Sequence, residues 1–335
     1  MTILGAIGDL TLSSGVVLPD AKLAYVTYGK LAQDGRNAVL LTHGYTSSHL
    51  FADGGPAASE GSWGSLVGPG APIDTDRFFV VSSNMLGSAF GSTAPRTMGP
   101  HGRAWGPDFP AISVRDIVAA QRRLLDSLDV KHLAAVVGPS YGGFQAFQWG
   151  VDFPDFVDAL VPAVTGPSRP PRGGGMDALA ARLAADPNWN GGHYYESGGI
   201  LATMTAIREE TLRGYGLEAE LAPRFPDVAA RAAEITRIAT AWAQAFDGHS
   251  LLVLGRALEG WDVTPDFPKL HARVLYVLSR TDALFPPRLA PGVMAALKAA
   301  GVQAEYEEID SEHGHLASGT DAAKWAPALR RFMAR

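Results

Sequence analysis

The chain has 335 residues, of which 47% are apolar and 19% are charged, and its formal net charge is −6. This composition is typical of a folded protein with a large core, and no dense Lys/Arg block predicts binding to nucleic acid or to an anionic membrane. The sequence contains no cysteine, which excludes disulfides, thiolate metal sites and a cysteine nucleophile.

No segment of the sequence predicts export or membrane insertion. The first nine residues lack a basic segment followed by a long apolar stretch, and no apolar run approaches the roughly 20 residues that span a bilayer. We therefore expect a cytoplasmic protein. The histidines and carboxylates do not show metal-ligand spacing, and no phosphate-binding glycine motif is found, so we expect neither a metal nor a cofactor.

Short apolar runs alternate with turns over the first 165 residues. Four of these runs predict strands, at residues 23–28, 38–42, 77–82 and 133–137. Ser113 and Asp116 have the spacing of a capping box, which predicts the start of a helix that ends near Leu128. Strands and helices in this order predict a mostly parallel sheet.

A Pro/Gly-rich segment at residues 166–175 is the strongest change of composition in the chain. The sequence from there to about Trp261 is Ala-rich and helical in pattern. We predict that residues 166–264 form a helical cap inserted into an α/β core made of residues 1–165 and 265–335. The last part of the core is predicted from strands at 273–278 and 303–309 and helices at 288–300 and 321–333.

A nucleophile elbow is predicted at Ser140. The strand at 133–137 is followed by Gly138-Pro139-Ser140-Tyr141-Gly142 and then by a segment compatible with a helix. In this G-x-S-x-G context the sharp turn lifts the serine hydroxyl above the sheet, and glycine at both ends avoids a clash with neighbouring backbone. The alternative is a glycine-rich turn that holds an incidental serine. The surrounding strand and helix favour the elbow, and with it an α/β-hydrolase fold.

The partners of such a serine are expected after late strands, in the order acid and then histidine. Asp282 follows the strand at 273–278 and is predicted to be the acid, although a turn aspartate is the alternative reading. His313 and His315 both follow the last strand, and we predict His315 as the base, with His313 as the alternative. The imidazole would take the serine proton, and the carboxylate would fix its tautomer.

Two backbone N–H groups are predicted to form an oxyanion hole. One belongs to Tyr141, directly after the nucleophile, and the other to Tyr45, in the loop after the strand at 38–42. His43 in the same loop is expected to hold the loop by hydrogen bonds rather than to take part in the reaction. Walls of the substrate pocket are expected from the cap, where aromatic side chains are plentiful; packing is the alternative role for these residues.

Several segments together resemble the homoserine O-acetyltransferases and their relatives. These segments are residues 25–29, 68–80, 83–87, 91–95, 109–116, 141–154, 186–192, 282–287 and 314–315. The resemblance covers about residues 20–200 and 270–335. It implies an α/β-hydrolase fold with a cap, a small-molecule ester, amide or acyl thioester as substrate, and a homodimer that pairs through cap helices.

The chain departs from that family where the substrate is recognised. Relatives that use homoserine have an arginine in a cap helix and an aspartate directly after the catalytic histidine. Here Leu316 follows His315, and an alignment of residues 199–211 puts Met204 at the arginine position, with Arg208 one helical turn later. Loss of a charged partner in a closed pocket costs about 2–5 kcal/mol. We therefore predict that L-homoserine is not the acceptor.

The sequence as a whole predicts a serine hydrolase that cleaves a small carboxylic ester or amide through an acyl-enzyme. The alternative is an acyl-CoA-dependent O-acyltransferase that uses a different alcohol, and a non-catalytic ligand-binding relative is a third reading. The candidate substrate-binding residues are Trp189, Tyr194, Met204 and Leu316.

Overall fold

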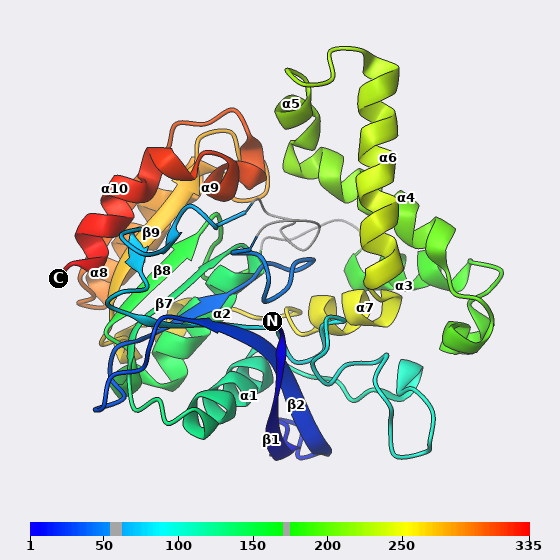
Figure 1. Ribbon diagram of the computed structural model, residues 1–335, viewed down its shortest axis with the longest axis horizontal. Helices are drawn as coiled ribbons and strands as arrows, with labels where there is room; N and C mark the ends of the chain where they lie inside the picture. Colours follow the sequence, from blue (N-terminus) through cyan, green and yellow to red (C-terminus); the bar gives the residue numbers. More distant parts are fainter. Residues whose placement is uncertain (54–61, 170–174) are drawn as a thin grey trace.

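The computed structural model describes residues 1–53, 62–169 and 175–335. A central sheet with flanking helices forms one part of the molecule, and five helices gather beside it (Figure 1). Residues 170–174 of the predicted Pro/Gly segment lie outside the described residues.

Within the described chain, eight strands form one sheet in the order β1-β2-β6-β3-β7-β8-β9-β10. Neighbouring strands from β6 to β10 are parallel, whereas β2 is antiparallel to both β1 and β6. This arrangement confirms the predicted mostly parallel sheet. The strands are β1 Ile3–Thr11, β2 Val17–Tyr28, β3 Ala38–Thr42, β6 Phe79–Ser83, β7 Leu133–Pro139, β8 Ala159–Ala163, β9 Arg273–Ser279 and β10 Ala304–Ile309; β4 Val67–Gly68 and β5 Ile73–Asp74 form a separate parallel pair.

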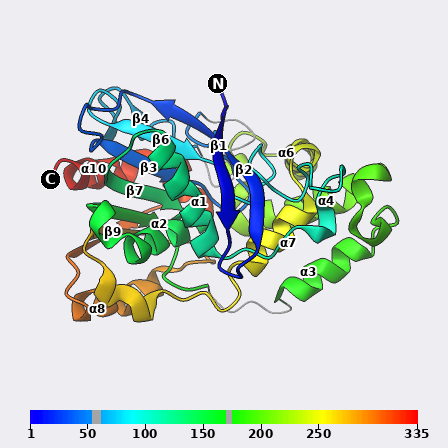
Figure 2. The same cartoon turned by 90° about the horizontal axis from the view of Figure 1, so that it is seen from below.

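The central strands β3, β7, β8 and β9 are buried on both faces, and their residues alternate between two apolar clusters. In β9, Val274 and Tyr276 belong to one cluster, and Leu275 and Val277 to the other. Helices α1 (Val114–Ser127), α2 (Tyr141–Asp152) and α8 (Ala290–Ala299) contribute to the first cluster, and α10 (Ala322–Met333) contributes to the second. Figure 2 shows α1 and α2 on one side of the strands and α10 on the other.

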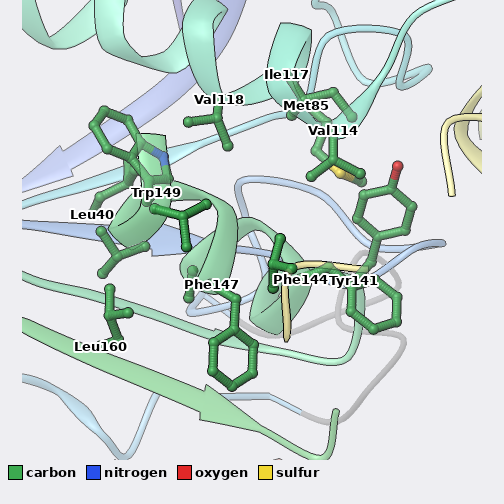
Figure 3. Packing of buried hydrophobic residues seen from close by; sticks show 14 of the residues in the cluster. Leu40, Met85, Val114, Ile117, Val118, Tyr141, Phe144, Phe147, Trp149 and Leu160 are labelled. Atoms are coloured by element: carbon green, nitrogen blue, oxygen red, sulfur yellow. The ribbon is translucent and has the colours of Figure 1, made fainter. Parts of the chain in front are cut away.

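Helix α2, which follows the predicted elbow, is held in the centre of the first cluster (Figure 3). Its aromatic side chains pack between α1 and the strands, so its N-terminus is fixed at the carboxyl ends of β3 and β7. The capping box predicted at Ser113 and Asp116 begins α1 in the structure. Residues drawn together in Figure 3 are Phe144, Phe147 and Trp149 of α2, Val114, Ile117 and Val118 of α1, and Leu40 and Leu160 of the strands.

The short helix α9 (Ala317–Thr320) precedes α10. Five further helices form a layer beside the carboxyl ends of the parallel strands, which we call the helical layer (Figure 1). It consists of α3 (Gly175–Ala184), α4 (Leu201–Tyr215), α5 (Leu217–Leu221), α6 (Val228–Ala245) and α7 (Gly248–Arg256). The limits of 166–264 for an inserted cap stay a prediction. None of the helices that the structure describes is long and apolar enough to cross a membrane.

Candidate active site

Ser140 lies in a strained turn between β7 and α2. Its backbone has φ 55° and ψ −118°, a conformation that non-glycine residues rarely adopt and that a structure must hold in place. Two hydrogen bonds hold this turn. The Ser140 N–H donates to Ala163 O at 2.8 Å, and the Thr165 hydroxyl donates to Ser140 O at 2.8 Å. The turn therefore depends on β8 as well as on β7.

The two glycines of the motif lie directly against β3. A Cβ atom at Gly138 would come within 2.2 Å of Thr42 Oγ1, and one at Gly142 within 2.3 Å of Thr42 O. The Thr42 hydroxyl donates to Gly142 O at 2.9 Å, which joins β3 to the first turn of α2. The expected clash with neighbouring backbone is confirmed, and the neighbour is Thr42.

A buried chain of hydrogen bonds joins Ser140, His315 and Asp282. His315 Nε2 lies 2.9 Å from Ser140 Oγ, and His315 Nδ1 lies 2.8 Å from Asp282 Oδ2. The exposed fractions of the three residues are 7%, 1% and 2% in the same order. Because an ionised carboxylate only accepts hydrogen bonds, Nδ1 carries the proton and Nε2 is left to accept from the serine hydroxyl. The structure thus brings the three predicted residues together, and the nitrogen that reaches Ser140 belongs to His315 rather than to His313.

The environment of Asp282 favours its ionised form. Burial alone raises the pKa of this carboxyl, but the charge and hydrogen bond of His315 and the backbone N–H groups of Leu284 and Phe285 lower it by more. The Leu284 N–H donates to Asp282 Oδ1 at 2.8 Å. Asp282 can therefore stay negative next to the imidazole and stabilise its protonated form.

Tyr45 and Tyr141, the predicted oxyanion residues, lie side by side. Their rings are stacked with 5.9 Å between centroids and 8° between planes, and both residues line the cavity beside Ser140. The Tyr141 hydroxyl donates to Leu254 O at 3.1 Å and the Tyr45 hydroxyl donates to Leu251 O, so both phenols are bonded to helix α7. The side chains thus join the helical layer to the sheet, while the peptide N–H of Tyr141 directly follows the serine.

His43 holds the loop between β3 and Tyr45. The Met85 N–H donates to His43 Nε2 at 3.2 Å, which leaves Nδ1 to donate to Gly44 O at 2.9 Å. Burial lowers the pKa of His43 to about 4, so the ring is neutral near pH 7. Both ring nitrogens are engaged by backbone, as the structural role predicted for His43 requires.

The cavity beside Ser140 is small, about 60 Å³, and its walls are mainly apolar and aromatic. The residues that line it are Tyr45, Ser140, Tyr141, Phe144, Arg169, Tyr215, Gly255, Leu258, Leu284 and Phe285. Sequence reasoning missed most of them because they come from separate elements. Among the missed residues, only Leu284 and Phe285 had a signal in the sequence, because they directly follow the segment of the predicted acid, Asp282.

Within the described residues, none of the four residues predicted to bind substrate lines the cavity beside Ser140, so their role in binding stays a prediction. Tyr194 and Met204 line a separate cavity of the helical layer, and Trp189 stacks on Tyr194 at 5.3 Å. Leu316, 3% exposed, packs into an apolar cluster with Leu212 of α4. The stacking of Trp189 on Tyr194 agrees with the packing role that the sequence left open as the alternative.

Arg208, rather than Met204, is the residue of α4 that reaches the loop of Tyr45. Its side chain is 2% exposed, its Nη1 donates to Thr46 Oγ1 at 2.8 Å, and its guanidinium lies 4.9 Å from the ring centroid of Trp242. The assignment of the arginine position to Met204 stays a prediction, and the structure places an arginine at the Tyr45 loop one helical turn later. A signal was present, because residues 204, 208, 212 and 215 recur at helical spacing and are all buried.

Comparison with known proteins agrees with this geometry. The family described as "alpha/beta hydrolase fold" matches residues 37–322. The chain is 34% identical to a homoserine O-acetyltransferase of Gluconobacter oxydans, with 97% of this chain and 90% of that protein covered. It is 35% identical to a homoserine O-succinyltransferase of Methylibium petroleiphilum, with 97% and 91% covered.

Among solved structures, the esterase E22 superposes with a TM-score of 0.88 at 25% identity, covering 99% of each chain. The relatives thus include both transferases and an esterase, on one fold and over nearly the whole length. The chain is an enzyme of the α/β-hydrolase family and belongs to the branch that contains the homoserine O-acetyltransferases.

Proposed function

We propose that the protein takes an acyl group from an activated ester or thioester onto Ser140 and passes it to a small alcohol. The observation that carries this proposal is the buried chain in which His315 Nε2 lies 2.9 Å from Ser140 Oγ and Nδ1 lies 2.8 Å from Asp282. A serine hydroxyl is a weak nucleophile until a neighbouring base takes its proton. This chain of bonds supplies the base and fixes its tautomer.

The first half-reaction acylates the serine. As Ser140 Oγ attacks the carbonyl carbon, its proton moves to His315 Nε2, and the negative charge on the carbonyl oxygen is held by the peptide N–H groups of Tyr45 and Tyr141. The tetrahedral adduct collapses with cleavage of the bond to the leaving oxygen or sulfur. The leaving group takes the proton from His315, so the base is neutral again.

The second half-reaction is the same step in reverse with a new partner. The acceptor hydroxyl gives its proton to His315 while its oxygen attacks the acyl carbon, and the Ser140 oxygen leaves and recovers that proton. The relatives named homoserine O-acetyltransferase and homoserine O-succinyltransferase support transfer of a short acyl group to an alcohol acceptor. The resemblance implies a cap arginine for such an acceptor, and Arg208, buried at the Tyr45 loop, is our candidate for that role.

Leu316 favours a second candidate function, hydrolysis of the acyl-enzyme by water. In the homoserine-specific relatives the residue after the histidine is an aspartate. Here that residue is apolar and packs beside Leu212, so it cannot pair with an ammonium group. The esterase E22 shows that this fold also hosts ester hydrolysis.

The two functions are separated by the fate of one acyl-enzyme. We expect mass spectrometry to find an acetyl group on Ser140 after mixing with acetyl-CoA or 4-nitrophenyl acetate, and not in Ser140→Ala. Adding a panel of small alcohols to the acylated enzyme should then raise the rate of deacylation and yield acetylated alcohol. Deacylation that no alcohol accelerates would assign the chain to the esterases, and absence of any adduct would contradict the acyl-enzyme itself.

A further inference from the structure

Arg169 is a charged residue that lines the cavity beside Ser140, and it has no role in the reaction proposed above. It follows β8 and is partly exposed. Its Nη1 donates to Gly255 O at 3.0 Å, in the last turn of α7, and its Nη2 lies 3.6 Å from Met176 Sδ. Both acceptors are neutral, and a thioether is a weak acceptor. These contacts hold the guanidinium in place without neutralising its charge.

The position of Arg169 is at the phenol end of the stacked tyrosines. Gly255, its hydrogen-bond partner, is so close to Tyr45 that an added Cβ would lie 2.9 Å from the Tyr45 hydroxyl oxygen. The preceding carbonyl, Leu254 O, accepts from the Tyr141 hydroxyl at 3.1 Å. Since the backbone of Tyr141 adjoins Ser140, Arg169 is separated from the serine by about the length of one tyrosine side chain.

The positive charge of Arg169 also acts on the Tyr141 hydroxyl. Burial, followed by the neighbouring Tyr45, raises the pKa of the Tyr141 hydroxyl, and the positive charge of Arg169 opposes the rise. This agrees with the geometric placement of the guanidinium near the far end of the Tyr141 ring.

The cavity has room for more than an acetyl group. A water molecule needs about 10–15 Å³ of such space, so a volume of about 60 Å³ holds roughly four to six groups of that size. Four apolar side chains, those of Phe144, Leu258, Leu284 and Phe285, line the same cavity. A cavity with a nucleophile at one end, apolar walls and a guanidinium at the other end matches a short methylene chain that carries a carboxylate.

We propose that Arg169 selects acyl groups that end in a carboxylate, so that the favoured donor is a monoester or monothioester of a short dicarboxylic acid of about the size of succinate. This inference rests on the proposed acyl-enzyme at Ser140. A carboxylate would accept from the guanidinium in a fork of two N–H donors, which a lysine cannot reproduce. Desolvation by the apolar walls would strengthen that pair relative to water.

The test compares monomethyl succinate with dimethyl succinate, which differ in the charge at the far end, by measuring methanol release. We expect kcat/KM to favour the anionic ester by roughly 10- to 100-fold in the wild type. Arg169→Met should remove this preference by slowing only the anionic ester, and Arg169→Lys should keep part of it. Arg256→Met is the matched control, because Arg256 follows Gly255 on α7 but is exposed and lies 3.8 Å from Asp177; it removes the same charge and should leave the preference unchanged.

Four outcomes would overturn the inference. Equal losses for both esters in Arg169→Met, together with a lower melting temperature, would show that Arg169 only anchors α7. A loss with acetyl-CoA but not with monomethyl succinate would show that the guanidinium binds the phosphates of the donor. Turnover of dimethyl succinate by the wild type without preference for the anionic ester would reject the selectivity alone, whereas absence of acylation by either ester would reject the proposed function with it.

Discussion

The ring of Tyr215 lies 4.9 Å from the imidazole of His315 between centroids, inclined by 52°. Tyr215 is the last residue of α4, and Arg208 on the same helix is bonded to Thr46. One helix of the helical layer thus contacts both the candidate base and the loop of Tyr45. Changes in the position of α4 should therefore alter both halves of the site together.

Ser140→Ala should abolish turnover while leaving the fold intact. The variant removes the attacking oxygen but fills the same turn, and loss of a triad nucleophile costs about 10⁴-fold or more in kcat. Steady-state rates with an activated ester, together with circular dichroism and the melting temperature, check both parts. Activity near the wild-type level would rule out the mechanism.

His315→Ala should lose several orders of magnitude more activity than His313→Ala. Only His315 is within hydrogen-bond distance of Ser140 and of Asp282 in the described site. The two variants are matched in chemistry and lie two residues apart, so each serves as control for the other. An inactive His313 variant beside an active His315 variant would reverse the assignment.

The free energy of unfolding should fall as the pH is lowered from 6.5 towards 4. The folded protein holds the pKa of His43 at about 4, below its ordinary value of 6.5, because the ring is buried. Between pH 6.5 and pH 4 the imidazole binds a proton in the unfolded chain but not in the folded protein. The free energy of unfolding should therefore be highest above pH 6.5 and fall by roughly 3 kcal/mol by pH 4. In urea unfolding at several pH values, the free energy of unfolding of His43→Asn should depend less on pH than that of the wild type. Equal dependence on pH in the two proteins would contradict the lowered pKa of His43.

L-homoserine should be a poor acceptor. The sequence predicts the loss of both charged recognition groups, and the burial of Leu316 among apolar side chains supports the loss of one of them. Steady-state kinetics with acetyl-CoA should show a rate with homoserine close to that of acetyl-CoA hydrolysis. Saturable transfer in the millimolar range would contradict it. Leu316→Asp should raise transfer to homoserine, with a loss of stability because residue 316 is buried among apolar side chains.

A homodimer through the helical layer is expected from the resemblance. Val228 on α6 is 69% exposed and Leu201 on α4 is 43% exposed, which leaves apolar side chains on this layer open to solvent. Light scattering should give twice the chain mass at micromolar concentrations, and Val228→Glu should weaken the association. A monomeric mass for the wild type across that range would count against the prediction.

The parts of this molecule that could be predicted from sequence are those whose local geometry demands particular residues. The elbow needs glycine on both sides of Ser140 because Thr42 lies against it. The capping box at Ser113 marks the start of α1 in a similar way. β8 escaped prediction because Ala159–Ala163 combines alanines with Pro162, which have low strand propensity, and tertiary pairing with β7 and β9 decides its conformation.

Residues that depend on the phase of a helix or on a distant loop were harder to place. Met204 and Arg208 differ by one turn and are both buried, and only the packing of α4 shows that Arg208 is the one that reaches the Tyr45 loop. Arg169 carries no local signal at all, since its partners, Gly255 and Met176, come from other segments. The chemistry of the serine could thus be predicted, but the walls around it could not.

The bonds from Tyr45 and Tyr141 to helix α7 couple two parts of the molecule that would otherwise fluctuate independently. The carbonyls of Leu251 and Leu254 lie on consecutive turns of α7 and receive the two phenols. Motion of α7 is therefore transmitted to the peptide groups beside Ser140, and the helix and the loop should exchange their amide hydrogens at correlated rates. A substrate that passed between the helix and the loop would have to break both bonds.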